Sequence, residues 1–266
     1  MEQTFDTPGP VLLAIQLGAG DIEVRATDTT TTRVRVSGYT KEQPPRVTCD
    51  PTPEGGHRVA IDHRMKKTWG LSFGRGVTVE VDVPTGTRLD GSSGAADVEA
   101  TGTYEAINVR TGSGDIRFDD VTGDVQIACA SGDVEGRSVR GHLSVKGASG
   151  DVEVGSVGDG LTVRSASGDI QVGRLDGSTV ITVGSGDIEL RDVGAGRVEI
   201  RAVAGDVEIG VRQGLGVWLD VSSTGGDVHS SLEAPGRDES REEPQLDLAV
   251  HTVSGDVDIR KASARS

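Results

Sequence analysis

One short phrase recurs along the chain at equal steps, and this repeat constrains the fold more than any other feature of the sequence. The phrase is Ser-Gly-Asp followed by Val or Ile, and each copy of the regular series lies eighteen residues after the previous one. Equal steps of this kind are typical of proteins built from stacked structural units. The regular series comprises Asp115, Asp133, Asp151, Asp169 and Asp187; one step back reaches Asp97, looser copies follow at Asp206, Asp227 and Asp256, and an isolated copy lies at Asp21.

Apolar residues recur at fixed places within each period, and they identify the side chains that we expect inside the structure. Two short segments alternate apolar and polar residues, as half-buried strands do, and Gly-rich turns separate them. Polar residues between the apolar ones, such as Glu135 and Glu153, are expected to face solvent. The inward candidates are Val98, Ile116, Val134, Val152, Ile170 and Ile188; Val121, Val139, Val157, Leu175 and Val193; and Ile107, Val109, Val125, Ile127, Leu143, Val145, Leu161, Val163, Val198 and Ile200.

These patterns predict an all-β fold, a β-solenoid resembling a parallel β-helix with about 18 residues per coil. Stacking identical coils about 4.8 Å apart buries a continuous column of Val, Ile and Leu, which one coil cannot do alone. Aromatic residues make up only 3% of the chain, so a core of small β-formers fits the composition. An antiparallel meander remains the alternative, because short strands joined by Gly turns also resemble hairpins.

The regular period divides the chain into two predicted parts. Residues 1–90 keep a strand pattern without the strict period, and we expect them to form an N-terminal β-strand cap, since open solenoid ends need covering. Residues 91–266 are the predicted repeat solenoid, with a charged, solvated loop at 232–245. Trp218 is expected to pack into the C-terminal core.

The repeated aspartate is the one chemical group that every period carries. Asp after Ser-Gly can accept hydrogen bonds from turn amides and hold the corner of a coil, which is the role we expect. The alternative is a row of bound calcium ions, as in β-rolls of eighteen-residue coils, but the GGxGxD motif of those rolls is absent. The calcium ladder would comprise Asp115, Asp133, Asp151, Asp169 and Asp187.

Catalysis finds no support in the sequence, and we expect neither an enzyme nor a cofactor. Polysaccharide-cleaving β-helix enzymes use a local carboxylate cluster, whereas these carboxylates belong to every repeat. No Ser lies in a GxSxG context, and Cys49 and Cys129 are expected to be free thiols. The histidines have no metal-ligand spacing, and no metal site is predicted from them: His57, His63, His142, His229 and His251.

The repeat is interrupted between His63 and Gly76 by a segment that combines aromatic and basic residues. Such a combination could anchor a protein partner or an anionic membrane surface. The alternative is a hairpin whose aromatic residues plug the end of the solenoid. The partner-binding candidates are Lys66, Lys67, Trp69, Phe73 and Arg75.

Net charge and hydropathy restrict partners and location. The formal net charge of -15 disfavours nucleic acid, whose binding depends on Lys and Arg that neutralise phosphates. No transmembrane segment is predicted, because no stretch approaches the eighteen apolar residues that a span requires. Because no signal peptide is visible, we expect a cytoplasmic protein, with cell-surface association as the alternative. The expected partner is a protein or an envelope component of unknown identity, and the oligomeric state is not predicted.

Three stretches resemble a known bacterial family: the repeated Ser-Gly-Asp-Val/Ile phrase, VTVEVDVPTGTRLD at 77–90 and HTVSGDVDIR at 251–260. The chain resembles the β-strand-repeat domains of unknown function that are often labelled "putative adhesin". The resemblance implies the repeat fold, and the family has no established catalytic residues to carry over. Many of its members are attached to membranes or linked to envelope-stress systems. The expected function is a non-catalytic scaffold or interaction protein. The alternatives are a calcium-stabilised adhesin-like surface domain and, more remotely, a carbohydrate-active β-helix enzyme.

Overall fold

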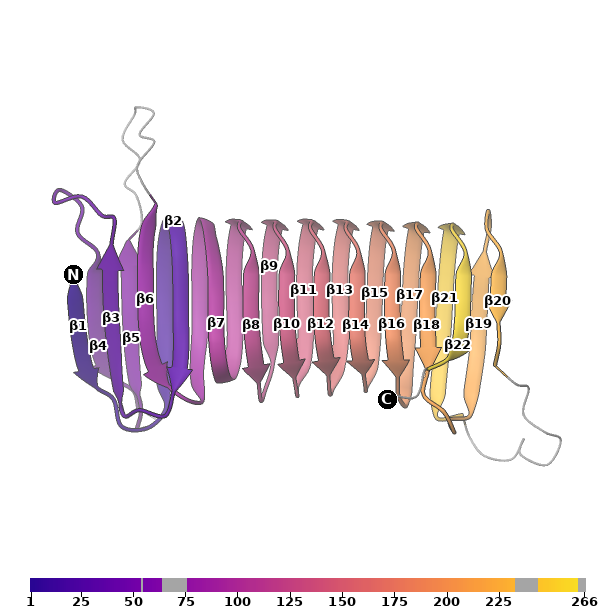
Figure 1. The fold of residues 1–266 in the computed structure, drawn as a ribbon, viewed down its shortest axis with the longest axis horizontal. Helices are drawn as coiled ribbons and strands as arrows, with labels where there is room; N and C mark the ends of the chain where they lie inside the picture. Colours follow the sequence, from indigo (N-terminus) through magenta and orange to yellow (C-terminus); the bar gives the residue numbers. More distant parts are fainter. Residues whose placement is uncertain (54, 64–75, 233–243, 263–266) are drawn as a thin grey trace. The chain divides into compact units, whose positions relative to one another are not determined.

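The fold is described from a computed structural model, which covers residues 1–53, 55–63, 76–232 and 244–262. Within these residues all regular elements are β-strands, and the all-β prediction is confirmed. The chain divides into two compact units, Met1–Gly136 and Arg137–Ser266. Each unit is a stack of coils in which one strand lies on each of two opposite sheets (Figure 1).

Unit 1 begins with a group of strands in mixed orientation and continues with parallel coils. Its longest strands, β2 and β7, turn a corner without interruption, so each supplies a strand to both sheets. The strand β10 (Val134–Val139) contains residues of both units. The remaining bounds are β1 (Glu2–Asp6), β2 (Val11–Thr27), β3 (Thr31–Ser37), β4 (Arg46–Pro51), β5 (His57–His63), β6 (Val77–Pro84), β7 (Thr87–Ser113), β8 (Ile116–Val121) and β9 (Val125–Ser131).

The strand β2 organises unit 1, because it lies between two other coils. Its first half pairs in parallel with β5 and its second half with β6, while β7 pairs in parallel along both halves. The early copy of the repeat at Asp21 therefore lies beside Asp97, although the two are far apart in sequence. Three antiparallel pairs, β1–β3, β3–β6 and β4–β5, lie on the other side of the β5–β6 coil.

Unit 2 stacks its strands in parallel and in register along both sheets. Leu143 pairs with Leu161, and Ile170 with Ile188, so equivalent positions of successive repeats become neighbours. This arrangement confirms the predicted parallel stacking and not the meander. The strands are β11 (His142–Ser149), β12 (Val152–Val157), β13 (Gly160–Ser167), β14 (Ile170–Leu175), β15 (Ser178–Ser185), β16 (Ile188–Val193), β17 (Gly196–Ala204), β18 (Val207–Val211), β19 (Val217–Ser223), β20 (Val228–Ser230), β21 (Leu246–Ser254) and β22 (Val257–Lys261).

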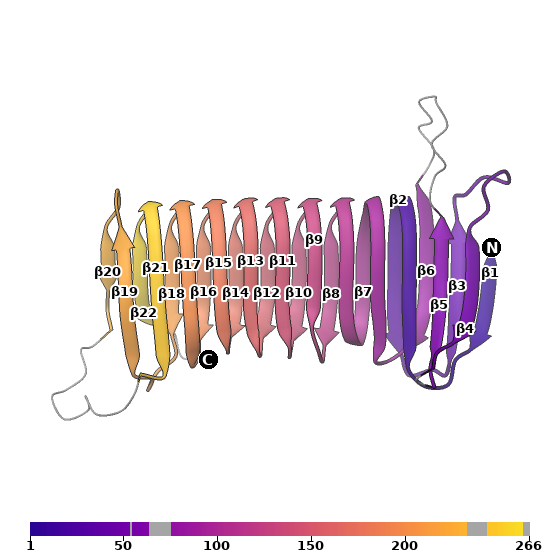
Figure 2. The ribbon, with the colours of Figure 1, turned by 180° about the vertical axis from the view of Figure 1, so that it is seen from behind.

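The last coils of unit 2 do not stack in sequence order. The strand β21 pairs in parallel with β17 on one side and with β19 on the other, and β22 likewise lies between β18 and β20. Figures 1 and 2 show β21 and β22 inserted before the β19–β20 coil. The phrase HTVSGDVDIR thus ends the sequence repeat but forms the penultimate coil of the stack.

The interior consists of columns of Val, Ile and Leu contributed by every coil, and the predicted inward residues are buried. Leu143, Leu161 and Val163 have no exposed surface. Complete burial of such a side chain contributes roughly 1.5–3 kcal/mol. Glu135 and Glu153, which follow buried valines in β10 and β12, are exposed as predicted. Some inward positions are threonines, and among them Thr179 occupies the column of Leu161 and Val198 with a hydroxyl that has no hydrogen-bond partner.

The prediction for Trp218 is wrong, because 62% of this residue is exposed. In β19 the alternation places Val217 and Leu219 inward, where they align with Leu246 and Leu248 of β21. Trp218 lies between them and aligns with Asp247 on the outer face. Successive side chains of a strand point to opposite faces of the sheet. Because Val217 and Leu219 take the inner face, Trp218 must lie on the outer face.

Candidate functional site

The glycine of the repeated phrase is required by the corner that it forms. Gly168 and Gly186 have φ values of 123° and 134°, which residues with a side chain rarely adopt. A Cβ on Gly186 would also come closer than 3.0 Å to the carbonyl oxygen of Gly168 in the neighbouring coil. Successive corners therefore pack backbone against backbone, and this contact fixes where each following aspartate lies.

The aspartate carboxylates of unit 2 form a chain of hydrogen bonds that runs from coil to coil, which we call the aspartate column. In each case the backbone N–H of one aspartate donates to Oδ1 of the aspartate in the adjacent coil. The donors and acceptors are Asp169 to Asp151, Asp187 to Asp169, Asp206 to Asp187, Asp256 to Asp206 and Asp227 to Asp256, each at 2.8 Å.

The same arrangement occurs in unit 1. The N–H of Asp115 donates to Oδ1 of Asp97 at 2.9 Å, and the N–H of Asp133 donates to Oδ1 of Asp115 at 3.1 Å. The predicted turn role of the aspartate thus takes a different form, because the amide it binds belongs to the next coil rather than to its own turn. Sequence spacing could not reveal this, since it does not show which corners touch.

The calcium alternative requires several ligands around one ion. Ca²⁺ takes six to eight oxygen ligands, and aspartates that alternate with backbone amides along a column present one carboxylate per coil. Among the described residues no group of three or more His, Cys, Asp or Glu side chains could hold a metal ion. The ladder of Asp115, Asp133, Asp151, Asp169 and Asp187 as a calcium site stays an untested alternative.

Ion pairs provide a second set of links between the coils of unit 2. The Arg212 guanidinium donates to Asp176 Oδ1 at 2.7 Å and to Asp192 Oδ1 at 3.0 Å, so one side chain joins three successive corners. Burial alone would raise the pKa of Asp176, but hydrogen bonds from Arg212 and Arg174 outweigh it and hold that pKa below its usual value. The charged Asp176 carboxylate therefore serves to hold neighbouring corners together.

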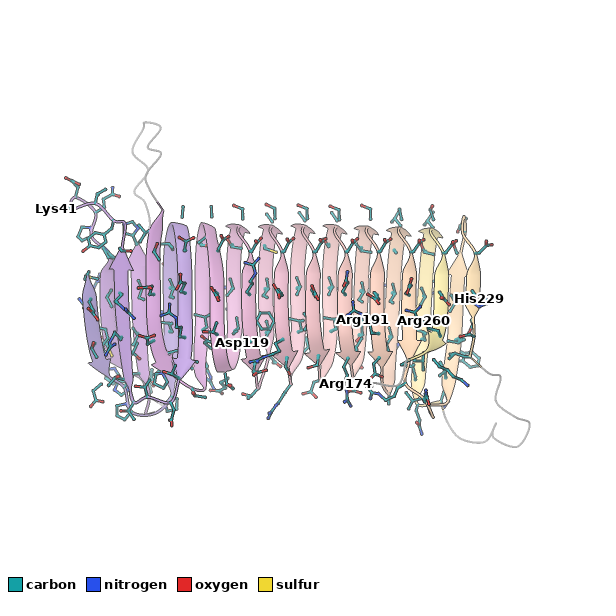
Figure 3. All side chains as sticks on the ribbon, viewed as in Figure 1. Lys41, Asp119, Arg174, Arg191, His229 and Arg260 are labelled. Carbon is teal, nitrogen blue, oxygen red and sulfur yellow. The ribbon has the colours of Figure 1, made fainter. Side chains whose placement is uncertain are left out.

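The outer face of β16, β18 and β22 carries further pairs of this kind. Arg191 donates to Glu189 at 3.0 Å, and Arg260 lies 2.9 Å from Glu208; both arginines are labelled in Figure 3. The hydrogen bond from Arg191 holds the pKa of Glu189 below its usual value. Exposed pairs of this type contribute less than about 1 kcal/mol each. They balance charges on the outer sheet face.

One arrangement that sequence reasoning missed joins Ser222 of β19 to His251 of β21. Ser222 Oγ and His251 Nδ1 are 2.9 Å apart on the outer sheet face, and the two residues are 29 positions apart in sequence. A Ser–His pair becomes a nucleophile when a third group orients the ring and N–H donors stabilise an oxyanion. Here the two residues are aligned neighbours on paired strands, so the contact links two coils.

Both cysteines are free, as predicted. Cys129 is buried, and burial raises the pKa of its thiol. Burial also raises the pKa of the Cys49 thiol. A thiolate is the reactive form of cysteine, so a raised pKa argues against a nucleophilic role for either residue.

The partner-binding candidates Lys66, Lys67, Trp69, Phe73 and Arg75 lie outside the described residues. The strands on either side of them are described: β5 ends at His63 and β6 begins at Val77. The strand β2 pairs with both of these strands, so the candidates lie in the sequence between two strands of one coil.

No helix in the described part of the chain is long and apolar enough to cross a membrane.

Among solved structures, a "putative lipid binding protein" from Parabacteroides distasonis is 13% identical, with 98% of this chain and 96% of that chain covered and a TM-score of 0.47. A "putative adhesin" from Bacteroides fragilis is 11% identical, with 97% and 96% covered and a TM-score of 0.43. A "putative cell adhesion protein" from Clostridium sporogenes is 11% identical, with 98% and 99% covered and a TM-score of 0.34.

A comparison with curated proteins gave no match. The family model described as Toastrack DUF4097, a family of unknown function, matches residues 12–260. This match spans the parallel coils of both units and the repeated Ser-Gly-Asp phrases. The chain therefore belongs to the Toastrack DUF4097 family.

Proposed function

We propose that this protein is a non-catalytic, acidic β-solenoid that serves as a scaffold or interaction module for a protein or an envelope component. The observation that supports this most is the aspartate column, in which the repeated carboxylate accepts the N–H of the adjacent coil. A residue that every coil uses for stacking is a structural residue. The repeat then supplies a rigid surface, and specific recognition belongs to the segments that interrupt it.

The proposal includes a division of labour along the chain. The eighteen-residue coil is the repeating unit of residues 91–266, and residues 1–90 act as its N-terminal cap. The cap is supported by the antiparallel pairs of β3 with β6 and β4 with β5, which cover the backbone edges of the first parallel coil. Truncation of residues 1–51 removes β1, β2, β3 and β4, and with them partners of β5, β6 and β7. The truncated chain should show concentration-dependent aggregation at neutral pH in light scattering.

A thermal melt with excess calcium and with chelator tests the structural role of the aspartates. A scaffold stabilised by backbone acceptors melts at the same temperature in both conditions. A rise of several degrees with calcium would mean that the native state binds the ion, because ligands that bind only the folded state stabilise it. That outcome would replace the scaffold by the calcium-stabilised surface domain.

Binding to vesicles tests the role of the His63–Gly76 segment. The probe is a vesicle rich in phosphatidylglycerol, with a phosphatidylcholine vesicle as its neutral counterpart. We expect Trp69→Ala to lower binding at least tenfold without changing the melting temperature, whereas Trp218→Ala, which removes an exposed aromatic residue elsewhere, leaves binding unchanged. Loss of folding in Trp69→Ala would instead favour the end plug. The proposed cytoplasmic location is tested separately by cell fractionation.

A further inference from the structure

The outermost coil of unit 2, formed by β19 and β20, leaves part of the apolar interior uncovered. Leu219 and Val228 point inward, in register with Leu248 and Val257, yet 37% of Leu219 and 47% of Val228 are exposed. Leu248 and Val257 in the next coil are at most 1% exposed. We call the β19–β20 coil the open end.

The open end also presents unpaired backbone. Among the described residues, β19 pairs only with β21, and β20 pairs only with β22. Proteins usually protect such edges with charged residues or proline. In the described strands of the open end, Asp220 is the one charged side chain at neutral pH, whereas the edge strand β4 of unit 1 carries Arg46, Asp50 and Pro51.

We propose that the open end docks on the open end of a second copy of this chain, around a two-fold axis. A two-fold axis perpendicular to the sheets makes β19 antiparallel to its counterpart and β20 antiparallel to its own. With the axis near Leu219, the two Leu219 side chains face each other inside, and Val217 faces Val221. The alternation of apolar and polar residues is kept, so the surface is complementary to itself.

The charges favour this closed pair over an endless stack. Asp227 ends the aspartate column of unit 2, and its neighbours in the column are exposed. The two-fold axis reverses strand direction, so the columns of the two copies lie at opposite edges and do not extend one another. Pairing of the open end with the edge strand β4 of another copy would instead place it beside Arg46, Asp50 and Pro51. A closed two-fold dimer therefore fits the open end better than an open stack of copies.

The size of the open end sets the expected strength of the contact. Seven residues of β19 at about 3.3 Å each, and two sheets about 10 Å apart, give an end face of roughly 400–500 Å² per copy when side chains are included. Stable interfaces bury about 800 Å² per partner. The dimer should therefore be weak, with a dissociation constant of about 10–100 μM.

Sedimentation equilibrium of the full chain over a wide concentration range tests the proposal. Leu219→Glu and Val228→Glu place charges in the open end and should weaken dimerisation at least tenfold. Val203→Glu is the matched control, because 56% of Val203 is exposed on the outer face of β17, away from the open end. Melting temperatures establish that all three variants are folded.

The geometry is tested by cross-linking in a background with Cys49→Ser and Cys129→Ser. Directly opposed residues of antiparallel strands have Cα atoms about 4.5–5.5 Å apart, which a disulfide can bridge. Leu219→Cys should form a covalent dimer on mild oxidation, and Val203→Cys should not. The proposal is wrong if the wild-type chain stays monomeric at several hundred micromolar, or if the control variants behave like the open-end variants. Either result would leave the proposed scaffold role intact.

Discussion

Replacing Gly186 with alanine should be among the most damaging single-methyl changes in this protein. Gly186 lies at a coil corner with a φ of 134°, and an added Cβ would come closer than 3.0 Å to the carbonyl oxygen of Gly168. Because that atom is backbone, the clash can be relieved only by moving one coil relative to the next. The same movement would stretch the hydrogen bond from the Asp187 N–H to Asp169.

The expected loss follows from two separate costs. A side chain held at positive φ costs roughly 1–3 kcal/mol, and forcing an extra methyl group into a packed contact costs typically 1–3 kcal/mol more. We therefore expect Gly186→Ala to lower the free energy of unfolding by about 3 kcal/mol or more. For a chain of this length, a loss of 3 kcal/mol corresponds to a fall in melting temperature of roughly 6–12 °C.

Gly214→Ala is the control that separates the two costs. Gly214 also has a positive φ, 84°, but a Cβ there would have no atom within 4 Å. It should therefore lose only the roughly 1–3 kcal/mol of backbone strain, and less than Gly186→Ala. Both variants are compared with the wild type by calorimetry and urea unfolding. Equal losses in the two variants would refute the reasoning, because they would show that close packing between the corners contributes nothing.

Three further predictions concern the interior and the links between coils. Thr179→Val should raise the free energy of unfolding by about 1 kcal/mol in urea, because it removes a buried hydroxyl without a partner; Thr162→Val, whose hydroxyl bonds to His142, should give no gain. Arg212→Met should lose at most about 1 kcal/mol at pH 7. Since the folded pKa of Asp176 is lowered, its stabilisation is present above the pKa of the unfolded chain and is lost as pH falls through the folded pKa, so melts of Arg212→Met and wild type should converge in acid. Cys129 should react with a thiol reagent only as fast as the protein opens, since only 7% of it is exposed.

The sequence allowed the repeat, the inward residues and the parallel stacking to be predicted, for one physical reason. Burial of one face imposes a two-residue period within each strand, and stacking imposes a constant sequence spacing between equivalent positions of successive coils. Both periods are visible in the printed sequence around Val152, Ile170 and Ile188. Where the two periods hold together, as in β11 to β18, the predicted interior is the observed one.

Neighbour relations outside the regular series could not be predicted in this way. Periodicity shows which face a residue occupies, but not which coil lies beside it. The pairing of Asp21 with Asp97 and the insertion of β21 between β17 and β19 are both choices of neighbour. The error at Trp218 came from treating a large aromatic residue as a core residue without applying the alternation of its own strand.

The aspartate column is the centre of this account, and hydrogen exchange at one amide tests it most directly. The measurement is the exchange rate of the Asp187 N–H, followed by NMR in the wild type and in Asp169→Ala, which removes its acceptor. We expect this amide to lose protection at least tenfold, while the Asp206 N–H, which donates to Asp187, keeps its own. Unchanged protection at Asp187 would contradict the claim that these carboxylates hold adjacent coils together.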